Sequence, residues 1–155
     1  MTISTFDEYD NVIEQCYYDT NGNLCLNNKN FALMRAQYDA HGRIIKESYY
    51  GLNGSLCNIA HVVRKYDMRG NLLEELAYGV DDHPCKSING YAKIVYEYDS
   101  FDNCINEAYY DEEGYACEDN NGYARKVYKY INKNKVYQII FYDKRGNIVH
   151  QESIL

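Results

Sequence analysis

The sequence has no tryptophan, a single proline and no long run of apolar residues. A membrane-spanning helix needs about 20 consecutive apolar residues, so none is expected here. The segment 1–8 has neither the basic residues nor the apolar core of an export signal, and we therefore expect a cytoplasmic protein. Basic residues are also scarce, with 16 Lys and Arg against 23 Asp and Glu and a formal net charge of −7. This balance argues against direct binding to nucleic acid, which needs clustered basic side chains, and favours a basic partner.

Tyrosine is abundant instead, with 19 Tyr and 4 Phe among 155 residues. Aromatic side chains suit the pleated, half-buried surface of a β-sheet. Segment 92–98 places Ala92, Ile94, Tyr96 and Tyr98 on one face in strict alternation, and no segment shows a sustained helical period. With 46% hydrophobic residues, the chain can form one folded domain over residues 1–155.

An aromatic residue followed by a turn recurs at ten positions, with spacings that alternate between 12 and 20 residues apart from one spacing of 16. These positions are Phe6, Tyr18, Tyr38, Tyr50, Tyr66, Tyr78, Tyr98, Tyr110, Tyr130 and Tyr142. The chain is therefore a tandem repeat of 32 residues whose second copy has 28 and whose fifth has 26. The repeats span residues 6–37, 38–65, 66–97, 98–129 and 130–155.

The turns that follow the aromatics have the signature Asp-x-x-Gly, as in Asp67-Met68-Arg69-Gly70, with Asp at the first position in seven of the ten and Gly51, Gly79 or Ile131 in the others. Asp at the first position of a type I turn accepts hydrogen bonds from the turn backbone, and the fourth residue of a bulged hairpin adopts a left-handed conformation. That fourth position holds Gly six times, Asp three times and Asn134 once, the residue types that adopt a positive φ at least cost. Ten hairpin turns are predicted.

An alanine recurs six residues before each new repeat, at Ala32, Ala60, Ala92 and Ala124. We call this residue the anchor alanine. Because it is present in the short second repeat as Ala60, the four missing residues belong between Cys57 and Ile59. The same segment is polar in the other repeats, which predicts a surface loop where a change of length costs little.

These patterns predict an all-β fold, a tandem array of β-hairpins with about three strands per repeat and about 15 in total. So many strands in one open sheet would curl, and neighbouring repeats bury one another's faces. We therefore expect a curled or spiral antiparallel β-sheet.

The motif Tyr-Asp-x-x-Gly-Asn, present at residues 66–71 and 142–147, resembles the YD repeats of bacterial Rhs proteins and teneurins. The resemblance covers nearly the whole chain and implies the same hairpin fold. In the Rhs family, far longer arrays spiral into a shell around a toxin. This chain is too short to enclose one, and its repeat is a doublet of 12 plus 20 residues.

Four of the six cysteines, Cys25, Cys57, Cys85 and Cys117, share one repeat position, where the fifth repeat has Val149. A position that accepts Cys or Val is typical of a small buried apolar site, so we predict a column of reduced, buried thiols. Disulfide pairing and metal binding are the alternatives. No CxxC or regular Cys/His ligand spacing supports a metal, and we predict no metal and no cofactor.

Catalytic motifs are absent from the sequence, including GxSxG, Walker A and GxGxxG. The four histidines fall at unrelated repeat positions, and adjacent acids such as Glu74 and Glu75 point to opposite faces of a strand. The segment 19–23 begins like a calcium loop but lacks the Gly and Glu that complete one. We predict that the protein is not an enzyme.

A candidate binding surface combines acids with tyrosines. Glu47, Glu75 and Glu107 share one repeat position, and Tyr17, Tyr49 and Tyr109 share the position two residues further on. Residues two apart on a strand point the same way, so stacked repeats would line them into a stripe, flanked by Asp111. The alternative is that this face is the second buried side of a coiled sheet. In that case the binding surface lies in the variable 20-residue loops.

Two classes of function fit the sequence. The first is a non-enzymatic protein-binding module, such as a small acidic inhibitor or immunity-type protein that covers a basic surface of its partner. The second is a carbohydrate-binding repeat of the cell surface, which only the abundance of Tyr and Asn supports. A small relative of an Rhs-type shell is a third candidate, based on analogy of fold.

Overall fold

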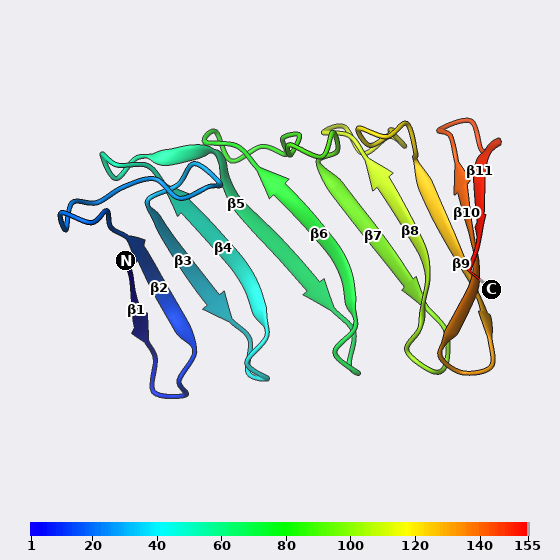
Figure 1. Cartoon of the computed structure of the whole chain (residues 1–155), viewed down its shortest axis with the longest axis horizontal. Coiled ribbons are helices and arrows are strands. Elements are labelled where there is room, and N and C mark those ends of the chain that lie inside the picture. Colours follow the sequence, from blue (N-terminus) through cyan, green and yellow to red (C-terminus); the bar gives the residue numbers. More distant parts are fainter. Residues whose placement is uncertain (155) are drawn as a thin grey trace. The chain divides into compact units, whose positions relative to one another are not determined.

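The computed structural model describes residues 1–154, which contain strands and turns but no helix. Eleven strands follow one another in sheet order as they do in sequence, each antiparallel to its neighbour where the register is defined (Figure 1). The strands are β1 (Thr2–Phe6), β2 (Val12–Tyr17), β3 (Leu33–Tyr38), β4 (Ile44–Tyr50), β5 (Leu56–Tyr66), β6 (Leu72–Tyr78), β7 (Lys93–Tyr98), β8 (Cys104–Tyr110), β9 (Arg125–Ile131), β10 (Lys135–Tyr142) and β11 (Ile148–Ser153). The predicted all-β array of antiparallel hairpins is confirmed.

The chain divides into two compact bodies. The first body comprises residues 1–64 and 77–83, and the second comprises residues 65–76 and the chain from Pro84 onward. Within the described residues, no helix is long and apolar enough to cross a membrane.

Nine of the ten predicted turns have the expected left-handed residue at the fourth position. Positive φ angles occur at Asp10, Gly22, Gly42, Gly54, Gly70, Asp82, Asp102, Gly114 and Gly146. The prediction is wrong at Asn134, where Asn132 takes the positive φ instead. Ile131, which follows Tyr130, pairs with Lys135 across a tighter hairpin.

Three further residues with positive φ lie outside the predicted turns, namely Asn30, Gly90 and Gly122. Each closes a second turn inside a long connection, as where the Gly122 N–H donates to the Asp119 carbonyl at 2.9 Å. The long connections therefore consist of two consecutive turns. The predicted third strand of each repeat is reduced to single bridges such as Tyr110 to Ala116, which is why there are 11 strands rather than about 15.

The short second repeat shows what its deletion removes. Strand β5 begins at Leu56 and runs for 11 residues, whereas the corresponding strands β7 and β9 have six and seven. In this repeat the strand replaces the second turn.

The core is made of small and aromatic residues at repeated positions. The four anchor alanines Ala32, Ala60, Ala92 and Ala124 are all buried, at 0 to 4% exposure. Hydroxyl groups of the repeat-start tyrosines link successive repeats. In the first body, the Tyr38 hydroxyl donates to the Val12 carbonyl at 2.9 Å. In the second body, the Tyr98 hydroxyl donates to the Leu72 carbonyl at 3.0 Å, and the Tyr130 hydroxyl donates to the Cys104 carbonyl at 2.8 Å. Each of these hydroxyl groups therefore bonds a backbone carbonyl of the preceding repeat.

The Tyr98 hydroxyl provides a test of this link. Tyr98→Phe should lower the free energy of unfolding by about 1 kcal/mol, because a part-buried carbonyl loses its donor while the ring remains. Urea denaturation measures the loss. Tyr9→Phe is the matched control, since the Tyr9 side chain is 77% exposed. Equal effects of the two substitutions would contradict the link.

Turn aspartates carry lowered pKa values. The Arg43 side chain donates to the Asp39 carboxylate at 2.6 Å, and the N–H groups of Arg43 and His41 add two more bonds. These contacts, Arg43 first, lower the pKa of Asp39 to about 2. Hydrogen bonds from the turn residues also lower the pKa of Asp7, Asp99 and Asp143.

A pH dependence follows, since the folded pKa of Asp39 lies below its ordinary value of 3.8. The contribution of Asp39 to stability is fully present above about pH 4 and is lost as the pH falls toward 2. Melting temperatures of the wild type and Asp39→Asn should therefore differ at pH 6 and converge near pH 2. A difference that stays constant with pH would refute this role for the carboxylate.

The four repeated cysteines are half-buried rather than buried, so that prediction is corrected. Cys25, Cys85 and Cys117 lie between the two turns of the long connections, where the Cys117 N–H donates to the Tyr109 carbonyl at 3.1 Å, and Cys57 lies in β5. No disulfide joins the six cysteines within the described residues. Burial raises the pKa of Cys57 and Cys117.

Candidate functional site

The predicted pairing of acids with tyrosines occurs in both bodies. The Tyr49 hydroxyl donates to Glu47 at 3.1 Å in the first body, and the Tyr109 hydroxyl donates to Glu107 at 3.0 Å in the second. Tyr17 makes the equivalent bond to Gln15 at 2.5 Å. Strand alternation thus places these residues as predicted.

The predicted exposure of this stripe is wrong. Tyr109 is only 2% exposed, because the Tyr91 ring stacks on it at 4.7 Å between centroids. In the first body, Phe31 packs on Tyr49 and Tyr17 at 4.9 and 5.6 Å. Phe31 and Tyr91 are supplied by the long connections, which fold back over the strands. Tyr109 is therefore part of the core, and Tyr17 and Tyr49 are half-buried.

The acids of the stripe are also enclosed. Glu47 and Glu107 have side chains 17% and 19% exposed, and Glu75 is half-buried. Arg64 pairs with Glu47 at 2.6 Å in the first body. Asp111 lies apart from the stripe and accepts the Tyr115 N–H at 2.8 Å within its own turn.

Glu107 is the centre of a polar network in the second body. Its carboxylate accepts the Tyr128 hydroxyl at 2.6 Å and the Tyr109 hydroxyl, and Lys126 lies 3.6 Å away. Burial, followed by the charge and hydrogen bonds of Glu107, raises the pKa of Tyr109 and of Tyr128. Burial also raises the pKa of Tyr96, with smaller effects from Glu107 and Glu75. All three tyrosines are therefore neutral at physiological pH, and Tyr109 and Tyr128 donate to Glu107.

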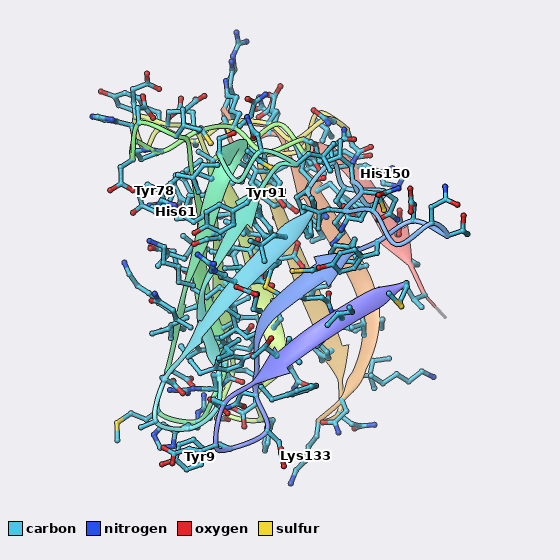
Figure 2. The ribbon with its side chains drawn as sticks, turned by 90° about the vertical axis from the view of Figure 1, so that its left-hand side faces the viewer. Tyr9, His61, Tyr78, Tyr91, Lys133 and His150 are labelled. Carbon is cyan, nitrogen blue, oxygen red and sulfur yellow. The ribbon has the colours of Figure 1, made fainter. Side chains whose placement is uncertain are left out.

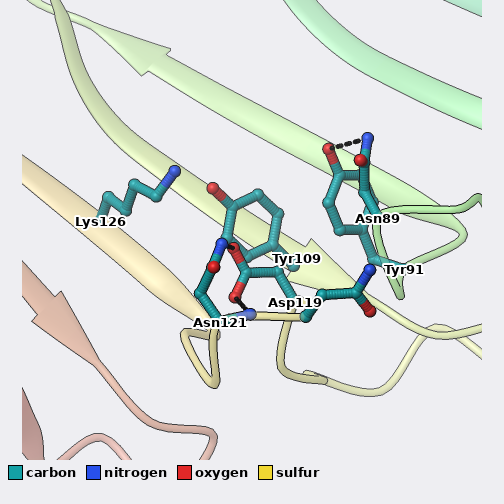
Figure 3. A pocket seen from close by; sticks show the side chains of 7 residues that line it. Asn89, Tyr91, Tyr109, Asp119, Asn121 and Lys126 are labelled. Carbon is teal, nitrogen blue, oxygen red and sulfur yellow. Dashed lines mark hydrogen bonds between the residues drawn. The ribbon is translucent and has the colours of Figure 1, made fainter.

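Beside this network lies a small polar pocket of about 280 Å³, which we call the amide pocket (Figure 3). Its lining residues are Asn89, Tyr91, Tyr109, Asp119, Asn120, Asn121 and Lys126. Two long connections form it, and Asn120 joins them by donating its backbone N–H to the Asn89 carbonyl at 3.0 Å and its side-chain amide to the Ile88 carbonyl at 2.6 Å. The pocket therefore depends on two successive repeats.

The connection Asp111–Tyr123, which we call the acidic connection, concentrates negative charge. It contains five carboxylates and no Lys or Arg, namely Asp111, Glu112, Glu113, Glu118 and Asp119. Glu113 is exposed, and Tyr115 beside it is 73% exposed. Lys86 of the preceding connection approaches Glu112 at 3.6 Å. An exposed aromatic ring surrounded by acids suits contact with a basic surface.

The opposite face of the sheet carries a repeated feature that sequence reasoning missed. In the second body, Lys93 lies over the Tyr110 ring at 4.8 Å, and Arg125 lies over the Tyr142 ring at 4.2 Å. Both bases directly follow an anchor alanine, which is a signal present in the sequence. Such cation–π contacts stabilise the pairing of neighbouring strands.

In the first body His61 occupies the same position after Ala60. Its ring stacks on Tyr78 at 5.2 Å, as Figure 2 shows, and its Nε2 lies 2.7 Å from the Asp82 carboxylate. At 8% exposure, His61 is the buried polar residue of the core. The contact fixes the turn 79–83 to strand β5.

Within the described residues, no group of three or more His, Cys, Asp or Glu side chains is arranged to hold a metal ion. The amide pocket is lined by nitrogen and oxygen groups of amides, two phenols, one carboxylate and one ammonium. Such a set can form hydrogen bonds to a ligand.

No protein-family model and no curated protein matches the sequence. Among solved structures, the chain is similar to one described as "Crystal Structure of TcdB2-TccC3-TEV", with a TM-score of 0.53 and 12% identity over 98% of this chain and 10% of that chain. A second, "Crystal Structure of TcdB2-TccC3-Cdc42", has a TM-score of 0.43 and 14% identity over the same shares.

The chain thus spans about a tenth of the length of these structures. At 12% identity the first likeness shows the fold alone. It is consistent with the YD-repeat-like hairpin fold that the turn motif predicts.

Proposed function

We propose that the chain is a non-enzymatic protein-binding module, such as a small acidic inhibitor, whose acidic connection contacts a basic surface of a partner protein. The observation that carries the proposal is the concentration of five carboxylates in nine residues around the exposed Tyr115. The rings that pack on Tyr49 and Tyr109 cover the stripe, whereas the acidic connection presents the exposed Glu113 beside the exposed ring of Tyr115. Opposite charge steers such partners together, and aromatic burial holds them.

Two features support this choice of surface. The acidic connection is held rigidly by its own turns, since Asp111 and Asp119 each accept backbone N–H groups within it. A preorganised loop loses little conformational entropy on binding. Its charge is also a large part of the net −7 of the chain.

The test compares two variants of equal net charge. Glu112→Gln/Glu113→Gln/Glu118→Gln removes three acids from the acidic connection, and Glu8→Gln/Glu97→Gln/Glu152→Gln removes three exposed acids elsewhere, so each has −7 + 3 = −4. Proteins captured from a host lysate are identified, and the purified partner is titrated by calorimetry at rising salt.

We expect a basic partner whose affinity falls as NaCl rises from about 50 to about 300 mM. The first variant should weaken binding at least tenfold, while the second should change it little. Equal effects of the two variants would contradict the proposed surface. If the chain retains glycans from the lysate but no protein, the carbohydrate-binding alternative is favoured.

A second candidate, a small relative of an Rhs-type array, is supported by the likeness of fold to TcdB2-TccC3. Under this proposal the hairpins pair with further hairpins of the same kind rather than with a basic protein.

A further inference from the structure

Four turns contain an Asn-Gly dipeptide whose glycine has a positive φ. They are Asn21-Gly22, Asn53-Gly54, Asn89-Gly90 and Asn121-Gly122, and all four asparagines are exposed. Such a pair is chemically reactive, because a glycine carries no side chain to keep its backbone nitrogen away from the side-chain carbonyl of the preceding asparagine. Attack by that nitrogen closes a five-membered ring and releases ammonia. The four sites can therefore be ranked by their surroundings.

One cost of the reaction is the same at all four sites. The glycine N–H donates to the carbonyl three residues earlier, at distances of 2.9 to 3.3 Å, and this bond must open before the nitrogen can attack. The glycine φ angles are also alike, between +76° and +94°. The backbone therefore does not distinguish the sites, and differences in rate must come from the side chains around each asparagine.

The side-chain carbonyl of Asn53 is held by two donors. In the turn between β4 and β5 of the first body (Figure 1), the Ser55 hydroxyl donates to Asn53 Oδ1 at 2.6 Å and the Ser55 N–H donates to the same oxygen at 3.2 Å. Attack on the carbonyl carbon places negative charge on this oxygen, and donors that are already in position stabilise that charge. The Asn53 Nδ2 group forms no hydrogen bond within residues 1–154, so it is free to leave.

The other three carbonyls lack such donors. The Asn21 side chain forms no hydrogen bond with the residues that the structure describes. Asn89 and Asn121 bond through Nδ2, which is the group that must leave. Asn89 donates to the Tyr91 hydroxyl at 3.5 Å, and Asn121 donates to the Asp119 carboxylate at 3.2 Å. These bonds hold the leaving group and do not polarise the carbonyl.

Charge also favours reaction at Asn53. Two of the other turns begin with aspartate, Asp19 and Asp119, whose carboxylates accept the N–H of the reactive asparagine at 2.8 and 2.9 Å. A negative charge at this distance opposes both the loss of the glycine amide proton and the charge that develops on the carbonyl oxygen. The turn of Asn53 begins with Gly51 and contains no carboxylate. Asn89 also lies in an uncharged turn, but only Asn53 adds the two donors.

We propose that Asn53 is a site of intramolecular deamidation, assisted by Ser55. The Gly54 nitrogen gives its proton to hydroxide and bonds to Asn53 Cγ, the Cγ–Nδ2 bond breaks, and Nδ2 leaves as ammonia with a proton from water. Water then opens the succinimide at one of its two carbonyls, which yields aspartate or isoaspartate. No oxidant or reductant is needed. The formal net charge becomes −7 − 1 = −8, and the reaction depends neither on a partner protein nor on the acidic connection.

The experiment ages the purified full chain at mildly alkaline pH and measures each site by peptide mass spectrometry, with isoaspartate detected by enzymatic methylation. Asn53 should react at least about fivefold faster than Asn21, Asn89 or Asn121, because preorganised donors lower the barrier. The same chain is aged in concentrated urea, where the four rates should approach one another because each asparagine precedes a glycine. A ranking that is unchanged in urea, or an Asn53 rate in buffer no higher than that of Asn21, would overturn the proposal.

The variants test the role of the Ser55 hydroxyl. Ser55→Ala should lower the rate at Asn53 at least about threefold, and Ser55→Thr, which retains a hydroxyl, should preserve it. The rates at the other three sites should stay constant, which separates this effect from a loss of folding that would raise all of them. Ser100→Ala, at an exposed serine outside the four turns, is the matched control and should change no rate. If Ser55→Ala leaves the rate at Asn53 unchanged, the hydroxyl has no part in the reaction and the proposal is wrong.

Discussion

Gly90→Ala is expected to lower the free energy of unfolding by about 2 to 3 kcal/mol, one of the two largest effects anticipated for a single substitution. Gly90 has φ +94°, and an added Cβ would lie 2.7 Å from Asn120 Oδ1 and 3.3 Å from Asn120 N. Asn120 is not free to move aside, because its backbone and side chain both bond to the preceding connection. Urea denaturation at neutral pH measures the loss.

Gly122→Ala is the matched control for this prediction. Gly122 occupies the same position one repeat later with φ +82°, and no atom lies within 4 Å of the added Cβ. Only the conformational cost remains, about 1 kcal/mol. If the two substitutions destabilise equally, the close packing of successive long connections does not exist.

Tyr109→Ala should destabilise the protein by about 3 to 4 kcal/mol. The substitution removes a ring that is 2% exposed and stacked on Tyr91, and it deprives Glu107 of a hydroxyl donor. Thermal and urea denaturation both report the loss. The large effect distinguishes a core tyrosine from a member of an exposed binding stripe.

Tyr115→Ala serves as the comparison, since this ring is 73% exposed. The substitution should change the free energy of unfolding by less than about 0.5 kcal/mol. If the Tyr109→Ala protein were as stable as the Tyr115→Ala protein, Tyr109 would be exposed, as the sequence predicted, and its burial in the structure would be contradicted.

Local chemistry explains which parts of the fold could be predicted from the sequence. A Gly or Asp four residues after an aromatic residue marks nine turns without help from distant residues, and an aspartate opens seven of them. The tenth prediction failed because Ile131 pairs with Lys135, which places the turn one step earlier, with the positive φ at Asn132. The second turns at Asn30, Gly90 and Gly122 were missed because no aromatic residue precedes them at the repeat spacing.

The candidate site was harder to predict because burial depends on residues far apart in sequence. Alternation correctly placed Glu107 and Tyr109 on one face. Whether that face is open depends on Tyr91, which belongs to the connection before β7. A signal was available, since Phe31, Tyr91 and Tyr123 each precede an anchor alanine, yet their target could only be seen in the folded chain.

The central claim is that the long connections, and not the strand faces, form the binding surface. Hydrogen–deuterium exchange of the chain with and without its purified partner tests it most directly. Protection on binding should be confined to the connections and strongest in residues 111–122. Protection confined to the strand segments β10 and β11, or to the short turns at Asp39, Asp67 and Asp99, would contradict the claim.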